Sequence, residues 1–330
     1  MKKRIFRELF LLGILFVLVW TSTHHSWAAE KKYPSGPIDL YCSFVAGGQS
    51  DLLNRALAKH LEKQLGVTVV PGNKPGAGGG VAASFLANSR PDGYTMGILA
   101  YEHFLQPILL GQANYSVEDL RIVGRVAQYC NVMAVTADAP WKTFQEFVDY
   151  ARKNPGVKYG HPGVGTTIFL RTDNLNRKAE LKMVGLPFKG DPETVAAVLG
   201  KHVPIGAYGS VAAKTQADAG KMRILFSFDP PAEFGFDPAI PDLRTAFGSI
   251  ADTDLEVFQN LIVPSKTPNE VVQVLERALE KIVKDPEFVS DLKKINLKVT
   301  YLDGNTVMQK IIPQRITNLK AALQQAGLLK

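Results

Sequence analysis

The chain has 330 residues, of which 46% are hydrophobic and 21% charged, with 38 Lys and Arg against 31 Asp and Glu. This is the composition of an ordinary globular protein, and the length predicts about two domains whose cores need no disulfide staples. The basic residues form no long block of the kind that marks a nucleic-acid binder, so we expect no nucleic-acid partner.

Residues 1–28 have the layout of a secretory signal peptide. The basic stretch MKKRIFRE precedes the apolar run LFLLGILFVLVW, and the polar stretch TSTHHSWAA follows. Ser26 and Ala28 place small residues at positions −3 and −1, which predicts export and cleavage near Ala28. An uncleaved membrane anchor is the alternative, and it is disfavoured because the apolar run is too short to span a bilayer comfortably.

The two cysteines of the chain, Cys42 and Cys130, both lie in apolar runs that resemble strands. Export makes a disulfide between them chemically possible. A buried free cysteine behaves as a small hydrophobic side chain, so we favour two unpaired thiols. The pairing geometry is not accessible from the sequence, and a disulfide stays open as the alternative.

Strand and helix patterns alternate along the whole chain after the signal peptide. Apolar runs predict strands at residues 38–45, 67–73, 94–100, 121–127, 131–137, 157–160, 183–188, 205–209, 222–228, 256–264 and 298–302. Amphipathic stretches and capping residues predict helices at residues 50–66, 76–89, 141–156, 168–178, 191–202, 269–295 (as two helices) and 306–328, with one more between the strands at 205–209 and 222–228. Thr143 is the predicted cap of one helix, and Asp191 is the predicted N-cap of another, with Pro192 at its first position. This alternation predicts an α/β protein with mostly parallel sheets flanked by helices.

The stretch FVAGGQSD connects the first strand to the first helix and has the features of an anion site. Its glycines let the backbone approach a ligand closely, and the helix start supplies free N–H groups and a partial positive charge. Ser50 either caps the helix or touches a ligand, and Asp51 either favours the helix dipole or selects an amino group. A simple strand–helix turn is the competing interpretation. The candidate residues are Phe44, Val45, Ala46, Gly47, Gly48, Ser50 and Asp51.

A second loop, GHPGVGTT at residues 160–167, repeats this arrangement of strand end, glycines, hydroxyls and helix start. Two such loops in separate strand–helix units suggest a ligand that is held from two sides. The candidate residues here are Gly163, Val164, Gly165, Thr166 and Thr167.

Catalytic patterns are poorly supported by the sequence. KPGAGGG, at residues 74–80, has neither the Gly-Lys-Ser/Thr ending of a P-loop nor the spacing of a dinucleotide fingerprint. The sequence contains no G-x-S-x-G elbow, which disfavours a secreted hydrolase, and its histidines form no metal-ligand motif. His103, in AYEHFLQP, is a candidate for the wall of a ligand cleft.

Four motifs, three of them close matches, together resemble those of the solute-binding receptors of tripartite tricarboxylate transporters, the Bug-type receptors. They are YPSGPI, the FVAGGQSD loop, NKPGAGG and RPDGYT, in the order and at the spacing typical of the family. The resemblance continues through YGHPGVGTT, LPFKGDPETVAAVLGKHV, AGKMRIL and IVPSKTPNEVV, and so covers residues 33–330 almost entirely.

The resemblance implies a two-domain Venus-flytrap fold with the ligand in the cleft between domains. It implies chain crossings near residues 129–133 and 256–260, and hence domain 1 at residues 29–130 plus 257–330 and domain 2 at residues 131–256. It also implies that residues 44–51 and 163–167 wrap a ligand carboxylate, partly through ordered water.

This sequence departs from the family pattern at several positions. Ser43 replaces the usual Pro, KGDP replaces a double glycine, Pro204 replaces an acidic residue, and YEHF replaces a polar segment. Phe169 stands where the family has His, and with Tyr101, Phe104 and Tyr208 it predicts a more aromatic cleft. An aromatic or bulky carboxylate is the resulting hypothesis for the ligand.

We therefore expect a periplasmic, non-enzymatic receptor that uses no cofactor or metal. It captures a small-molecule carboxylate and passes it to membrane permease subunits, and we expect the receptor to be a monomer. A sensor subunit that presents the same ligand to a two-component receptor kinase is the alternative function.

Overall fold

The computed structural model describes residues 32–248 and 255–330. The predicted signal peptide and its cleavage site near Ala28 lie outside these residues. No helix within the described ranges is long and apolar enough to cross a membrane.

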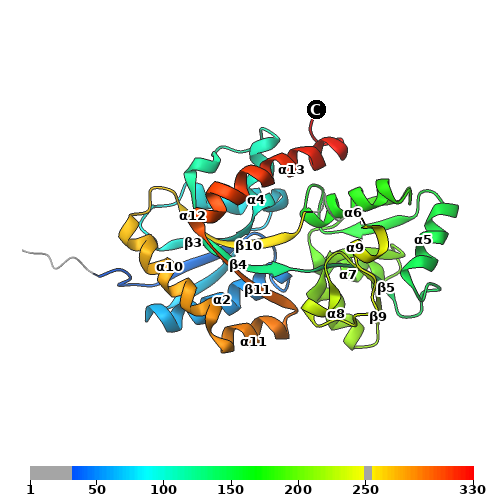
Figure 1. The fold of residues 1–330 in the computed structure, drawn as a ribbon, viewed down its shortest axis with the longest axis horizontal. Helices are drawn as coiled ribbons and strands as arrows, with labels where there is room; N and C mark the ends of the chain where they lie inside the picture. Colours follow the sequence, from blue (N-terminus) through cyan, green and yellow to red (C-terminus); the bar gives the residue numbers. More distant parts are fainter. Residues whose placement is uncertain (1–31, 249–254) are drawn as a thin grey trace, which may run out of the picture. The chain divides into compact units, whose positions relative to one another are not determined.

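The first sheet has six strands in the order β11-β4-β10-β3-β1-β2. Their bounds are β1 Ile38–Cys42, β2 Val69–Asn73, β3 Thr95–Ala100, β4 Leu120–Tyr129, β10 Val257–Pro264 and β11 Leu297–Asp303. The helices that accompany these strands are α2 Gln49–Leu65, α3 Gly80–Ala87, α4 Tyr101–Leu109, α10 Asn269–Lys284, α11 Pro286–Lys294, α12 Gly304–Thr306 and α13 Ile312–Gln325 (Figure 1).

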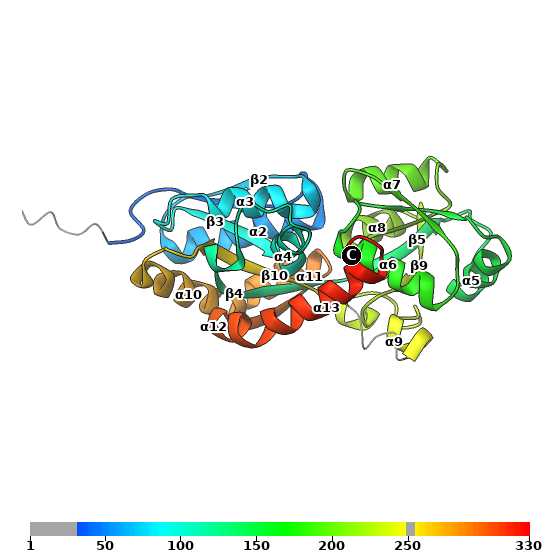
Figure 2. The ribbon, with the colours of Figure 1, turned by 90° about the horizontal axis from the view of Figure 1, so that it is seen from above.

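The second sheet has five strands in the order β7-β6-β8-β5-β9. Their bounds are β5 Asn131–Thr136, β6 Lys158–His161, β7 Val184–Pro187, β8 Ile205–Gly209 and β9 Met222–Ser227. Its helices are α5 Phe144–Lys153, α6 Thr167–Lys178, α7 Asp191–Leu199, α8 Ser210–Asp218 and α9 Leu243–Phe247 (Figure 2).

Two sheets flanked by helices confirm the predicted α/β class, but both sheets are mixed rather than mostly parallel. In the first sheet β1 pairs in parallel with β2 and β3, whereas β10 and β11 run antiparallel to their neighbours. The chain leaves this sheet along β4, which ends at Tyr129, and enters the second sheet at Asn131. It returns along β10 in the opposite direction, so β4 and β10 must pair antiparallel.

Helix α2 is amphipathic and packs through its apolar face. Leu53, Leu57 and Leu61 recur every four residues and are completely buried. The helix ends at Gly66, whose left-handed φ of 70° suits a residue without a side chain. Through this buried face α2 contacts β1 and β2, and α10 and α11 also pack against it. The N-terminal end of α2 is thereby held in a fixed place.

The capping predictions for two helices have different outcomes. Thr143 caps α5, and its hydroxyl accepts a hydrogen bond from the Glu146 N–H at 3.2 Å. The N-cap of α7 is Gly190 and not Asp191, which moves to the first helical position with Pro192 behind it. Gly190 has a φ of 132°, a conformation that favours glycine, and it carries the turn that the prediction had placed at Asp191. The Asp191 carboxyl is therefore available for another contact.

The predicted C-terminal helix is interrupted. A π-helical stretch, Val307–Ile311, precedes α13, and Pro313 lies in the first turn of α13, where it removes a backbone donor.

The two thiols agree with the favoured prediction, because Cys42 and Cys130 are both buried and free. Burial raises the pKa of the Cys42 thiol to about 11, which keeps it protonated and unreactive at neutral pH.

Candidate functional site

A cavity is lined by loops and strands that belong to both sheets. The lining residues from elements of the first sheet are Phe44, Val45, Gly48, Gln49, Ser50, His103, Tyr129, Val257 and Gln259. Those from elements of the second sheet are Asn131, Pro162, Thr166, Thr167, Ile168, Gly190, Asp191, Pro192 and Gly209. The cavity thus lies at the carboxyl ends of β1, β6, β7 and β8, where α/β proteins commonly bind ligands.

Four helices begin at this cavity, and their N-termini give it a positive electrostatic character. The first residues of α2, α6 and α7 and the N-cap residue of α8 all belong to the lining. The first backbone N–H groups of a helix have no acceptor within the helix and carry a partial positive charge. No Lys or Arg lies among the described residues of the lining. Anion binding here would therefore rest on backbone N–H groups.

The first predicted loop divides into lining residues and residues that hold its shape. Phe44, Val45, Gly48 and Ser50 line the cavity, whereas Ala46, Gly47 and Asp51 do not belong to the lining. Asp51 accepts hydrogen bonds from the Gly47 N–H at 3.0 Å, the Arg55 side chain at 2.9 Å and the Asn73 amide at 3.0 Å. Burial alone would raise the pKa of Asp51, but these hydrogen bonds outweigh it and lower the pKa. Asp51 therefore fixes the loop.

The second predicted loop uses its hydroxyl groups internally. Thr166 caps α6 by accepting from the Phe169 N–H, and it donates to the Gly163 carbonyl at 2.7 Å. The Thr167 hydroxyl donates to the Glu102 carboxylate of α4 at 3.1 Å. Both threonines line the cavity, and their neighbours Gly163, Val164 and Gly165 lie outside the lining. The backbone N–H groups of Thr167 and Ile168 are left as the donors that this loop offers to a ligand.

His103 lies in the wall of the cavity as a neutral side chain. Its Nδ1 accepts a hydrogen bond from the Ala100 N–H at 3.1 Å and lies 2.8 Å from the Ser43 hydroxyl. An Nδ1 that accepts places the remaining proton on Nε2. Burial lowers the pKa of His103 to about 3, so the ring stays uncharged at neutral pH. His103 can therefore donate a hydrogen bond from Nε2 but brings no positive charge.

The aromatic side chains expected to line the cleft are packed elsewhere. Tyr101 and Phe104 are buried in the hydrophobic cluster of the first sheet, and Phe169 packs against the same cluster. Tyr208 is completely buried in a cluster of the second sheet, and its hydroxyl donates to the Ala134 carbonyl at 3.3 Å. None of these four residues belongs to the lining of the cavity. Phe44 and Tyr129 are the aromatic residues that do line it.

Gln259 is a lining residue that the sequence analysis missed. It lies on β10 beside a register shift between Gln259 and Asn260, an irregularity that changes where side chains point. The side chain is completely buried, and neither its amide nitrogen nor its amide oxygen has a hydrogen-bond partner in the protein. A buried amide without partners is costly unless a ligand or water completes it. The signal in the sequence was a polar pair within the apolar strand VFQNLIVP.

Asp191, the predicted N-cap of α7, faces the cavity. Its carboxylate accepts a hydrogen bond from the Gly209 N–H at 3.2 Å, the backbone group at the start of α8. The side chain is partly exposed because open space of the cavity borders it, and protein surrounds it on the other sides. This enclosure raises the pKa of Asp191 to about 6, against the lowering effect of the Gly209 hydrogen bond.

A buried ion pair holds the lining residue Asn131 in place. Arg171 of α6 forms two hydrogen bonds with Asp229, at 3.0 and 3.1 Å, and a third with the Asn131 side chain at 3.1 Å. Asp229 also accepts from the Asn131 N–H at 3.2 Å. Both charged side chains are almost fully buried. This network fixes α6, the end of β9 and the start of β5 relative to one another.

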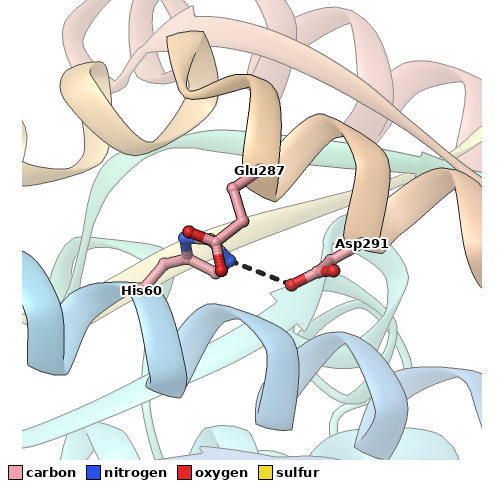
Figure 3. A group of neighbouring side chains, drawn as sticks. All are labelled: His60, Glu287 and Asp291. Atoms are coloured by element: carbon pink, nitrogen blue, oxygen red, sulfur yellow. Dashed lines mark hydrogen bonds and ion pairs between the residues drawn. The ribbon is translucent and has the colours of Figure 1, made fainter.

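A second group of polar side chains lies away from the cavity and has the donor types of a metal site. His60 of α2 faces Glu287 and Asp291 of α11, and their ligand atoms lie within 4.8 Å of one another (Figure 3). Lys59, however, binds both Glu287 and Asp291 at 2.9 Å, and Lys63 binds Glu287 at 3.0 Å. These lysines already neutralise the carboxylates. The group is therefore best described as an ion-pair network that joins α2 to α11.

Comparisons with known proteins decide the class of this fold. The model of the tripartite tricarboxylate transporter receptor family matches residues 53–328. The chain belongs to this receptor family. A relative from Cupriavidus necator, the UPF0065 protein in the gbd 5' region, is 32% identical over 304 residues, which cover 92% of this chain and 91% of that protein.

Solved structures agree with the family at the level of fold. The periplasmic binding protein BugD has a TM-score of 0.81 at 23% identity and covers 90% of this receptor and 100% of its own chain. An R. palustris protein solved with adipate has a TM-score of 0.80 at 22% identity and covers 89% of this receptor and 98% of its own chain. The receptor thus has a periplasmic-binding-protein fold, and its family consists of proteins that bind a solute without converting it.

Proposed function

We propose that this receptor captures a compact carboxylate in the cavity and delivers it to a membrane permease of the tripartite tricarboxylate type. One observation carries the proposal. The first residues of α2 and α6, whose N–H groups have no acceptor within their own helices, line the same cavity as the unpartnered amide of Gln259. These are groups that hydrogen-bond a carboxylate without a metal or a cationic side chain.

Each part of the lining has a proposed contact with the ligand. The ligand carboxylate lies against the N–H groups of α2, at Gln49 and Ser50, and of α6, at Thr167 and Ile168. Hydrogen bonds from N–H groups to a carboxylate are charge-assisted and roughly twice as strong as neutral ones. The amide of Gln259 and the Nε2–H of His103 complete the polar contacts, and Phe44 and Val257 supply apolar surface.

The size of the cavity favours a compact ligand. Its volume is about 60 Å³, which is above the roughly 10–15 Å³ that a cavity needs to hold a water molecule but leaves room only for a small ligand. The hypothesis of an aromatic or bulky acid rested on Tyr101, Phe104, Phe169 and Tyr208, and all four lie outside the lining. The adipate in the R. palustris structure supports a carboxylate as the ligand class.

Ligand capture is proposed to involve closure of two domains, residues 29–130 with 257–330 and residues 131–256. Contacts between elements of the two sheets suggest how a closed state is held. Thr167 binds Glu102, and the Gln49 amide lies 3.5 Å from the Ser210 hydroxyl. A ligand that contacts α2 and α6 together would favour this closed state over an open one. The hinges would lie at Cys130 and just before Val257.

The proposal places the receptor in the periplasm after cleavage near Ala28. It acts as a monomer that meets the permease subunits transiently, without a cofactor. Family membership and the BugD fold support this location and role.

A thermal-shift screen of residues 29–330 against small mono-, di- and tricarboxylates and amino acids tests the proposal. A ligand that binds only the folded state raises the melting temperature, by about 5 °C when its concentration is about 100 times its dissociation constant. Gln259→Met removes the amide at nearly constant volume, and we expect it to abolish the shift. Gln128→Met makes the same change at a buried glutamine on the adjacent strand outside the lining, and this matched control should keep the shift.

Thr166→Ala would be a poor variant for this purpose because its hydroxyl caps α6. Absence of a shift with every acid, from folded protein freed of any co-purified ligand, would contradict the proposal. A shift that survives Gln259→Met would place the ligand elsewhere.

A further inference from the structure

The cavity contains one carboxyl group of the protein itself. Asp191 is the only Asp or Glu among the described residues of the lining, and His103, the only other titratable side chain there besides Tyr129, is neutral. No Lys or Arg of the described lining neutralises Asp191. Its carboxylate accepts a hydrogen bond from a backbone group, the N–H of Gly209. A negative charge therefore borders the space that the ligand occupies.

Asp191 takes a position where an incoming anion would otherwise bind. It lies in the first turn of α7, and its partner Gly209 is the N-cap of α8, so the starts of two helices face this one carboxylate. The next N–H of α8, that of Ser210, is already bound to the Cys130 carbonyl. The space is tight as well, because a Cβ added at Gly209 would lie 2.7 Å from Asp191 Oδ2. The protein thus fills this half of the site with its own anion.

The N-termini of α6 and α2 differ from those of α7 and α8. The first turn of α6 contains no acidic residue. The acid in the first turn of α2 is Asp51, which is bound to Gly47, Arg55 and Asn73 and does not line the cavity. A ligand carboxylate therefore has one free anion position, at α2 and α6, and meets a fixed negative charge at the other.

Gln259 lines the same cavity as the free anion position at α2 and α6 and as Asp191. Its buried amide has a free donor in Nε2 and a free acceptor in Oε1. A ligand with a carboxylate and an ammonium group would satisfy both atoms, whereas a dicarboxylate would satisfy only the donor. The unpartnered acceptor is an observation independent of Asp191, and it favours the same ligand chemistry.

We infer that Asp191 is a specificity-determining residue that selects a compact monocarboxylate carrying an ammonium group over a dicarboxylate of similar size. This inference rests on the proposed function, because it presumes that a carboxylate binds at α2 and α6. The ammonium group lies between Asp191 and the Gln259 amide oxygen. A second carboxylate in that place would face the charge of Asp191 inside a poorly solvated cavity, which disfavours it strongly.

Isothermal titration calorimetry of residues 29–330 at pH 7.5 with matched acids tests this inference. The pairs are 3-aminopropanoate with malonate, 4-aminobutanoate with succinate and 5-aminopentanoate with glutarate, and butanoate is the acid with neither second group. We expect the best amino acid of the series to bind at least about ten times more tightly than its dicarboxylate partner. The best chain length then reports the spacing between the two ends of the site.

Asp191→Asn removes the charge while keeping an acceptor for the Gly209 N–H. We expect it to reduce the preference for the amino group at least about tenfold. Glu193→Gln makes the same chemical change two residues further along α7, at an exposed side chain outside the lining, and should leave the preference unchanged. Circular dichroism of each variant establishes that it is folded.

The outcomes separate this inference from the proposed function. If dicarboxylates bind as tightly as their amino partners, or if Asp191→Asn leaves the ratio unchanged, the inference is wrong while the carboxylate receptor stands. If neither the wild type nor Asp191→Asn binds any of the seven acids, the carboxylate site itself fails, and the inference fails with it.

Discussion

Asp191 and Asp291 are carboxyl groups in opposite surroundings. Asp191 borders the cavity with one backbone hydrogen bond and no cation, and enclosure raises its pKa to about 6. Asp291 lies on α11 among Lys59, Lys294 and His60, whose hydrogen bonds lower its pKa. The first carboxylate has capacity left for a ligand, and the second has its partners supplied by the protein.

The comparison shows why a gathering of charged side chains is a weak guide to a binding site. The His60, Glu287 and Asp291 group has the donor types of a metal centre, yet its charges are already balanced. The cavity has few charged side chains, but the amide of its lining residue Gln259 lacks partners in the protein. Unsatisfied hydrogen-bonding capacity, and not the density of charge, distinguishes the two regions.

The largest effect on stability is expected for the ion pair of Asp229, a third carboxyl group, with Arg171. Both side chains of this pair are almost fully buried. Arg171→Met leaves the Asp229 charge without its partner, and we expect a loss of about 3–5 kcal/mol in the free energy of unfolding. Urea denaturation followed by circular dichroism measures it. Arg177→Met breaks an exposed pair with Asp173 on the same helix and should cost less than about 0.5 kcal/mol. Similar losses of unfolding free energy for both variants would show that burial does not determine how much each ion pair matters for stability.

A smaller and opposite effect is expected at Asp191. Its folded pKa lies about two units above the ordinary value, so the folded state holds its proton more tightly and stability falls as pH rises from about 4 to 6. At pH 7.5 Asp191→Asn should therefore raise the unfolding free energy of the empty protein. Two units correspond to about 3 kcal/mol at most, and exposure to the cavity reduces this to about 1–2 kcal/mol.

Denaturation curves at pH 7.5 and pH 4 check the effect at Asp191. The stabilisation by Asp191→Asn should be fully present at pH 7.5 and mostly lost at pH 4, where the wild-type carboxyl is protonated in the folded state and about half protonated in the unfolded chain. A variant that is less stable than the wild type at pH 7.5 would show that Asp191 is a structural residue.

Selectivity for the amino group should weaken at acid pH. Since the pKa of Asp191 is about 6, only about a tenth of the side chain is ionised at pH 5. The preference for 4-aminobutanoate over butanoate should therefore fall by up to about tenfold between pH 7.5 and 5. Tyr129, Tyr208 and His103 do not titrate in this range, because burial raises the pKa of both tyrosines and lowers that of the histidine. Titration calorimetry at both pH values measures the ratio, and Asp191→Asn should show no such change.

The smallest effect is expected in the network of α2 and α11. Asp291→Asn should lower the melting temperature by about 1–2 °C in low salt, because exposed ion pairs contribute little. The pKa of Asp291 is lowered, so its contribution is present at neutral pH and is lost as pH falls below the ordinary carboxyl range. The difference should disappear in 1 M NaCl (a Debye length of about 3 Å). A drop that persists in high salt would mean that the network is more than a screened surface feature.

The sequence predicted the elements that carry strong local signals. The helix containing Leu53, Leu57 and Leu61 and the cap at Thr143 were predicted because period and capping chemistry are local. Helix α4 was missed because β3 ends at Ala100 and α4 starts at Tyr101, with no loop residues between them to mark a boundary. The antiparallel strands were missed because strand direction depends on where the chain returns, which no local pattern encodes.

The candidate site was predicted in part for the same reason. Glycine-rich helix starts indicated both loops, and Phe44, Gly48, Ser50, Thr166 and Thr167 do line the cavity. The sequence could not tell that the threonine hydroxyls bind Gly163 and Glu102, since those partners depend on tertiary packing. Gln259 and Asp191 were not predicted as site residues because their significance lies in missing partners. The aromatic residues were assigned to the cleft from type alone.

A crystal structure of residues 29–330 with the tightest-binding acid of the thermal-shift panel would show where the ligand carboxylate binds. We expect a carboxylate of the ligand within about 3 Å of backbone nitrogens at the starts of both α2 and α6, with the Gln259 amide in contact with the ligand. A ligand bound outside this cavity, or one whose carboxylate avoids both helix starts, would rule out the proposed carboxylate site.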